Sequence, residues 1–167
     1  EFRRVLFRSQ GIYADILARV AGAKLTNGIR GVLWHQGEQS QGAASGLPLG
    51  YDYLAYQKHF VDMSAAWKQD FPNLRYYYIY QIWPAACGDQ SANDMLREVQ
   101  RTLPRLYSNM RVMSTLGIVP GSSCHYSIPG YVRFFDLIGP LVKQDNYGFV
   151  PPGDITAPDL KQAYFTT

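Results

Sequence analysis

The hydrophobic positions along the chain follow two different periods. Apolar and aromatic residues recur three or four positions apart in four segments, as on one face of a helix. These segments cover residues 12–20, 53–67, 91–103 and 131–138. Between them lie three short, nearly continuous apolar runs, which are typical of buried strands. These runs cover residues 29–35, 75–83 and 110–116. Gly139 and Pro140 follow the last helical segment, and we expect them to interrupt it.

The predicted elements alternate, with one helix between each pair of successive strands. Such alternation implies right-handed crossovers and therefore a parallel sheet with helices on both faces, which places the chain in the α/β class. In open α/β sheets, functional groups gather in the loops at the carboxyl ends of the strands. Three loops qualify here, and they cover residues 35–38, 84–89 and 121–125.

Composition limits the function classes. The 167 residues suffice for one domain with a sizeable core, and a hydrophobic content of 47% argues against disorder. The net charge is +3 without a basic stripe, so the sequence does not favour nucleic-acid binding. No apolar run approaches the roughly 20 residues that cross a bilayer, so we expect no membrane association.

The two ends of the chain differ from the middle. Residues 1–9 fit neither period, and "VLFRS" within them resembles the translation of a common sequencing-library adapter. We interpret these nine residues as an artefact. They contain three arginines and one glutamate, so excluding them lowers the net charge from +3 to +1. Residues 10–146 then form the α/β domain, and the Pro- and Gly-rich segment 147–167 is interpreted as a linker leading out of it.

Candidate chemistry lies where the first strand ends, in the stretch "GVLWHQGE". It presents His35, Gln36 and Glu38 together, and His125 lies in the loop after the third strand. Acyl transfer uses such a set: an imidazole accepts the nucleophile's proton, a carboxylate orients the imidazole, and an N–H group stabilises the oxyanion. An alternative is that Glu38 only caps the following turn.

The same stretch resembles the Gln-Gly-Glu block of the sialate O-acetylesterase group of SGNH-type hydrolases. The acetylxylan esterases of carbohydrate esterase family six share this block. The segments "YYYIYQIWP", "LREVQ" and "CHY" add to a resemblance that spans roughly residues 11 to 148. It implies a partial flavodoxin-like three-layer sandwich whose first strands lie upstream of residue 10. It also implies serine-type hydrolysis of acetyl esters on sugars without a cofactor, and a β-rich domain that begins within residues 147–167.

The resemblance also assigns roles. Gln36 would donate its side-chain N–H to the oxyanion and His125 would be the general base, with His35, Gln81 and Arg97 binding substrate or lying beneath the pocket. The sequence departs from the family at two places. The Gly-Gln-Ser-Asn block that supplies the nucleophile is absent, so we expect the chain alone to be inactive. Ser122 stands where the family places an Asp, so we expect Glu38 to orient His125.

Two other functions remain open. One is a lipase-like or thioesterase-like SGNH hydrolase, which a deep apolar slot would favour over a shallow cleft lined by Tyr and Trp. The other is a carbohydrate-binding domain without catalysis. The two cysteines, Cys87 and Cys124, lie in loops that meet if the second and third strands are neighbours. Because relatives are commonly exported, we expect a secreted or periplasmic protein, in which these cysteines could form a disulfide.

Overall fold

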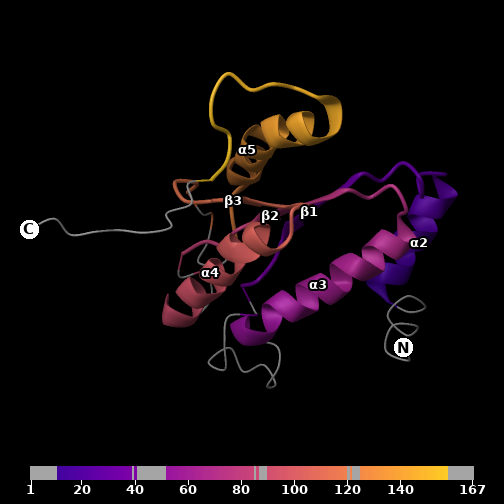
Figure 1. Cartoon of the computed structure of the whole chain (residues 1–167). Coiled ribbons are helices and arrows are strands. Elements are labelled where there is room, and N and C mark those ends of the chain that lie inside the picture. The colour runs from indigo at the N-terminus through magenta and orange to yellow at the C-terminus, as the bar shows by residue number, and fades with distance from the viewer. Residues whose placement is uncertain are drawn as a thin grey trace, which may run out of the picture.

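The computed structural model (Figure 1) describes residues 11–38, 40, 52–84, 86, 90–119, 121 and 125–157. Within these residues, helices and strands alternate as the hydrophobic pattern predicts. The helices are α2 (Ile12–Gly22), α3 (Tyr53–Asp70), α4 (Gln90–Leu106) and α5 (Ile128–Tyr147). The strands are β1 (Gly31–His35), β2 (Tyr76–Tyr80) and β3 (Met110–Met113). The α/β class is therefore confirmed.

The three strands form one sheet in the order β1-β2-β3, and both pairings are parallel. Gly31 pairs with Tyr76 in the first ladder, and Tyr77 pairs with Met110 in the second. Adjacent parallel strands place their carboxyl ends at the same edge of the sheet. This edge therefore carries the loops in which the sequence predicts the functional groups.

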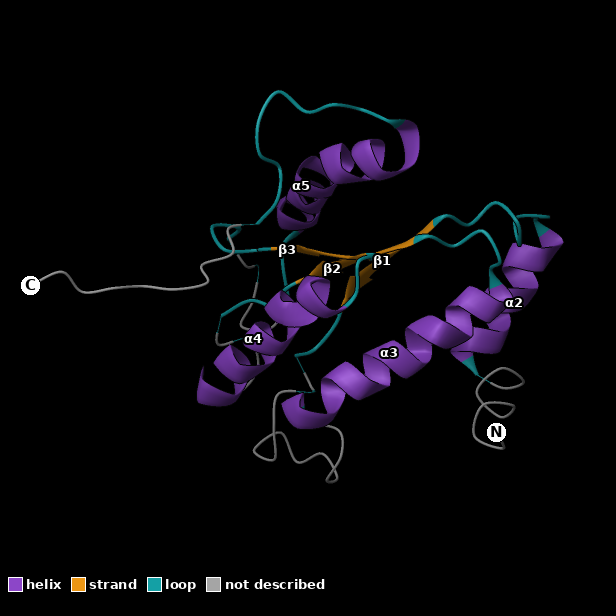
Figure 2. Cartoon of the chain, in the orientation of Figure 1, coloured by secondary structure: helices purple, strands orange, loops and turns teal. Residues whose placement is uncertain are grey.

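Helices cover both faces of the sheet, with α5 on one side and α3 and α4 on the other (Figure 2). Both faces need a cover because the side chains of a strand alternate between them, and in β2 they enter two separate cores. Tyr77 and Ile79 pack with residues of α3 and α4, whereas Tyr78 and Tyr80 pack with residues of α5. The arrangement is consistent with part of a flavodoxin-like fold.

Several boundaries differ from the prediction. Strand β3 ends at Met113 rather than near residue 116. Strand β2 ends at Tyr80 rather than near residue 83, because side chains of α4 bind the main chain of the next residues. The expected interruption at Gly139 and Pro140 was wrong, since α5 continues to Tyr147. Pro140 removes a helical hydrogen bond to the carbonyl of Asp136, but Asp136 is exposed, so water can satisfy that carbonyl.

The segment after α5 contains no helix or strand over residues 148–157. It is nevertheless in contact with the domain, because Ile155 packs against the core cluster on the α5 side of the sheet. The predicted adapter segment, residues 1–9, and the end of the predicted linker, residues 158–167, lie outside the described residues. None of the described helices has both the length and the apolar character that crossing a membrane requires.

Candidate functional site

The turn after β1 requires a glycine at its centre. Gly37 is buried, with φ at 147°, a conformation that residues with a side chain rarely adopt. A Cβ atom at this position would lie 2.9 Å from Cγ2 of Ile82 and 3.0 Å from Cδ2 of Leu96. The first distance is shorter than real Cβ contacts, and the second is tighter than nearly all of them. The Gln-Gly-Glu turn therefore lies directly against the loop after β2 and against α4.

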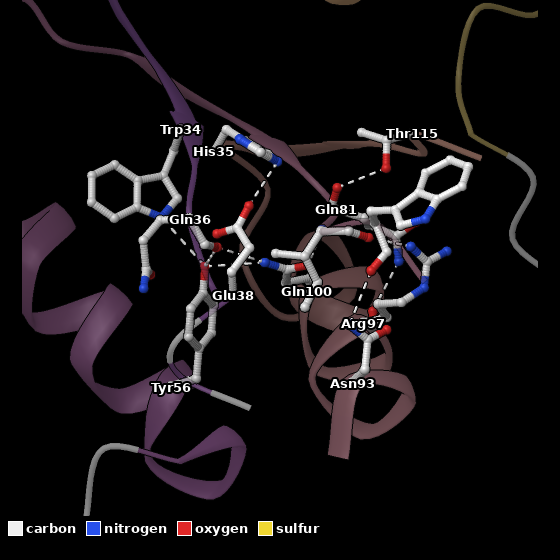
Figure 3. Close-up of polar contacts among 12 residues, drawn as sticks. Trp34, His35, Gln36, Glu38, Tyr56, Gln81, Asn93, Arg97, Gln100 and Thr115 are labelled. Carbon is white, nitrogen blue, oxygen red and sulfur yellow. Dashed lines mark hydrogen bonds and ion pairs between the residues drawn. The ribbon is translucent and has the colours of Figure 1, made fainter. Parts of the chain in front are cut away.

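The main chain of this turn is held by two buried side chains (Figure 3). The carbonyl of Gln36 accepts hydrogen bonds from the Tyr56 hydroxyl at 3.1 Å and from Nε2 of Gln100 at 3.1 Å. Tyr56 in turn accepts from Nε2 of Gln100 at 3.2 Å and from Nε1 of Trp34 at 3.3 Å. Burial raises the pKa of Tyr56, so its hydroxyl stays protonated and remains a donor.

Helix α4 holds the loop after β2 in a similar way. Oε1 of Gln100 accepts from the Ile82 N–H at 3.1 Å, and Nδ2 of Asn93 donates to the Trp83 carbonyl at 2.9 Å. The Arg97 guanidinium donates to the Ile82 carbonyl. These three side chains of α4 take the place of a strand partner for this loop, and they bring it beside the Gln-Gly-Glu turn.

Gln81 and Arg97, which the resemblance assigns to substrate binding, make main-chain contacts. Nε2 of Gln81 donates to the carbonyl of Arg97 at 2.9 Å, and the Gln81 carbonyl accepts from the Thr115 hydroxyl at 2.9 Å. Gln81 is 6% exposed, and burial lowers the pKa of the Arg97 guanidinium. Both residues therefore support the loops from beneath, and a contact with substrate stays a prediction.

His35 and Glu38 lie side by side at the end of β1. His35 Nε2 is 3.3 Å from Oε1 of Glu38, and the two side chains are 15% and 12% exposed. The two groups are in contact, but the geometry is not that of a hydrogen bond, and they form an ion pair only when the imidazole is protonated. Four aromatic rings also surround the imidazole, with centroid distances from 5.1 to 6.5 Å. They belong to Phe134, Tyr126, Tyr131 and Tyr80.

Electrostatics links this pair to His125. Burial lowers the pKa of His35, the Glu38 carboxylate opposes this shift, and the charge of His125 adds to it. His35 is therefore neutral at pH 7, and His125 lies near enough to influence it. His125 itself is exposed, and its carbonyl accepts from the Gly121 N–H at 2.9 Å.

The structure thus brings His35, Glu38 and His125 to one edge of the sheet. The contact described for Glu38 is with His35, and orientation of His125 by Glu38 stays a prediction. The amide of Gln36 donates to the Ser40 hydroxyl at 3.0 Å. The predicted disulfide between Cys87 and Cys124 lies outside the described residues, as does Ser122.

Sequence reasoning assigned no role to two amides of α4 that support this edge. Asn93 and Gln100 are 0% exposed, as are Leu96 and Leu103. The spacing of these four residues is 3, 4 and 3, so they form one core-facing stripe. An amide in such an apolar stripe has to find buried partners. The presence of amide residues at core-facing positions of this helix was therefore the sequence feature that could have predicted their supporting role.

Two other kinds of site, a metal site and a ligand cavity, can be compared with the described residues. Among them, no group of three His, Cys, Asp or Glu side chains is placed to hold a metal ion. A cavity of about 540 Å³ lies along the outer edge of β3, between residues of α4 and the segment after α5. Gln36, Glu38 and His125 do not line this cavity, whereas Gln81, which the resemblance assigns to substrate binding, does.

Comparisons of the chain with protein-family models, with curated proteins and with solved structures find no match. The chemistry of the site is therefore judged from its geometry. A half-buried carboxylate, a neutral imidazole and an exposed imidazole lie beside an amide-bearing turn that glycine and two buried partners hold in place. Such a set can move a proton and stabilise a developing negative charge.

Proposed function

We propose that this chain is the later part of the catalytic domain of an exported carbohydrate O-acetyl esterase, similar to the sialate O-acetylesterases of the SGNH class. The observation that supports this most is the gathering of Glu38, His35 and His125 at the carboxyl edge of a parallel sheet, where Gln36 lies in the turn that follows β1. In this proposal a flavodoxin-like sheet continues beyond β1 with strands from upstream sequence.

Each group has a role in ester hydrolysis. His125 accepts the proton of a serine hydroxyl as that oxygen attacks the acetyl carbon, and later returns it to the leaving sugar oxygen. Gln36 stabilises the oxyanion through its side-chain N–H. Glu38 orients the base, either directly or through His35. The serine comes from another part of the polypeptide, because the 167 residues contain no Gly-Gln-Ser-Asn block.

Aromatic side chains near the site favour a sugar ester over a long acyl chain. Tyr131 is 37% exposed and its ring lies 6.2 Å from that of His35, and Trp83 is partly exposed beside Tyr126. Partly exposed aromatic rings offer flat, amphipathic faces for stacking.

The test uses the full-length protein that carries this sequence. Release of acetate from O-acetylated sialic acid and from acetylated xylo-oligosaccharides is compared with hydrolysis of aryl palmitate and acyl thioesters. We expect turnover of the acetylated sugars, and Gln36→Ala should lower kcat by roughly 10²-fold or more. His59→Ala, on the exposed side of α3, is the matched control and should keep the wild-type rate.

The other outcomes are equally informative. Faster turnover of palmitate or thioesters than of acetylated sugars would replace the proposal with a lipase-like or thioesterase-like enzyme. Binding of acetylated sugars without any turnover would identify a carbohydrate-binding domain. A wild-type rate in Gln36→Ala would remove the oxyanion role from that residue.

A further inference from the structure

Gln100 occupies an unusual position for an uncharged polar residue. It lies on the core-facing stripe of α4 and is 0% exposed, yet every hydrogen-bonding group of its amide has a partner. Its Nε2 donates to the Gln36 carbonyl and to the Tyr56 hydroxyl, and its Oε1 accepts from the Ile82 N–H. One side chain therefore joins the turn after β1, helix α3 and the loop after β2.

This position fixes the turn because a buried amide loses free energy whenever a partner moves away. The peptide unit between Gln36 and Gly37 is trans and planar, so holding its carbonyl orients the whole unit. Gly37 lies so close that a Cβ atom there would be 3.2 Å from Nε2 of Gln100. The turn can shift only if Gln100 gives up bonds that water cannot replace at this depth.

We propose that Gln100 is a positioning residue for the oxyanion-stabilising turn. It acts by holding the Gln36–Gly37 peptide in the orientation from which the Gln36 side chain reaches the developing charge. Gln100 has no contact with substrate in this role, and Tyr56 is its partner at the same carbonyl. The inference rests on the proposed esterase function for its effect on catalysis, but its effect on the turn can be measured without any ester.

The experiment uses the full-length protein and the variant Gln100→Met, which keeps the side-chain volume and removes all three hydrogen bonds. Leu103→Ala is the matched control, because Leu103 is also 0% exposed on α4 but contacts no part of the turn through hydrogen bonds. We expect Gln100→Met to lower kcat about tenfold with little change in KM. Leu103→Ala should lower the melting temperature without a comparable loss of kcat.

A second experiment tests whether the effect of Gln100 on kcat depends on Gln36. In the Gln36→Ala background, Gln100→Met should cause little further loss of kcat, because the group that it positions is already absent. The same tenfold loss in that background would overturn the proposed role and leave Gln100 as a residue of general stability only.

Amide hydrogen exchange separates this inference from the esterase proposal. Residues 36–38 and the Ile82 N–H should exchange faster in Gln100→Met than in Leu103→Ala, after correction for global stability. If wild type hydrolyses no ester but this difference is seen, the esterase proposal fails and the positioning of the turn stands. If exchange at the turn is the same in the two variants, the positioning role is wrong whatever the activity.

Discussion

The turn after β1 and the loop that carries His125 end at the same edge of the sheet, but the fold holds them differently. The turn is centred on a buried glycine that no other residue can replace without a clash, and its main chain is bound by Tyr56 and Gln100. His125 is exposed, and its carbonyl bond to Gly121 is a local contact within the loop.

If the proposed esterase function holds, this difference separates two physical tasks. A donor that stabilises a developing charge has to be in place before the charge forms, so a rigid, buried turn suits it. A base has to accept and release a proton and stay near solvent, so an exposed loop suits it. Changes in the turn should therefore lower the free energy of unfolding, whereas changes at His125 should leave it nearly unaltered.

The largest effect is expected for Gly37→Ala. The new Cβ atom would meet Ile82 and Leu96 in a backbone conformation that alanine disfavours, so we expect a loss of roughly 2–4 kcal/mol in the free energy of unfolding. Urea denaturation measures it. Gly117→Ala is the control, since Gly117 has φ at 88° but no neighbour within 4 Å of a Cβ atom. Equal losses in the two variants would show that the turn is not tightly packed.

Tyr56→Phe should have the next largest effect. It removes the hydroxyl that donates to Gln36 and accepts from Trp34 and Gln100, which should cost about 1–3 kcal/mol in the free energy of unfolding.

Tyr53→Phe is the matched control for this variant, one turn earlier on α3. No hydrogen bond of the Tyr53 hydroxyl is found among the described residues, so its removal should change stability by less than about 0.5 kcal/mol. If the two variants are equally stable in urea, the hydroxyl of Tyr56 does not hold the turn.

The pH dependence of stability should reveal the titration of the half-buried His35 imidazole. Burial lowers its pKa below the usual 6.5, so the unfolded chain binds this proton more readily than the folded protein does. The contribution of His35 to stability is therefore complete above pH 6.5 and decreases as the pH falls toward its folded pKa. Free energies of unfolding at pH 7.5 and 5.5 measure this decrease.

His35→Phe keeps a ring among the surrounding aromatic side chains and removes the titrating group, so it should reduce the loss of stability between these two pH values. His59→Gln changes an exposed histidine and should leave the loss as it is in the wild type. An unchanged pH dependence in His35→Phe would mean that other groups cause it.

The smallest effect on stability is expected for His125→Ala. Because the side chain is exposed, the free energy of unfolding should change by less than about 0.5 kcal/mol. In the full-length protein the same substitution should remove acyl turnover, as the proposed role of general base requires. A destabilisation as large as that of Tyr56→Phe would contradict the contrast between the two regions.

The order of the elements could be predicted because each of them buries one continuous or periodic set of apolar residues. Strand β2 and the stripe of α4 are examples. The end of β2 and the continuity of α5 could not be predicted in this way. Arg97 and Gln100 of α4 set the end of β2 through contacts with its following loop, and the exposed position of Asp136 lets α5 continue past Pro140.

The sequence by itself determined the α/β alternation and the place of Gln36, Glu38 and His125 at strand ends, because period and order are local properties of the chain. Only the tertiary structure decided which groups meet. The contact between Glu38 and His35 and the contact between Gln100 and the Gln36 carbonyl depend on how α4, α5 and the strands pack. Gln36 and Gln100 are 64 positions apart in the sequence. A local sequence pattern cannot predict which distant carbonyl a buried amide will bind.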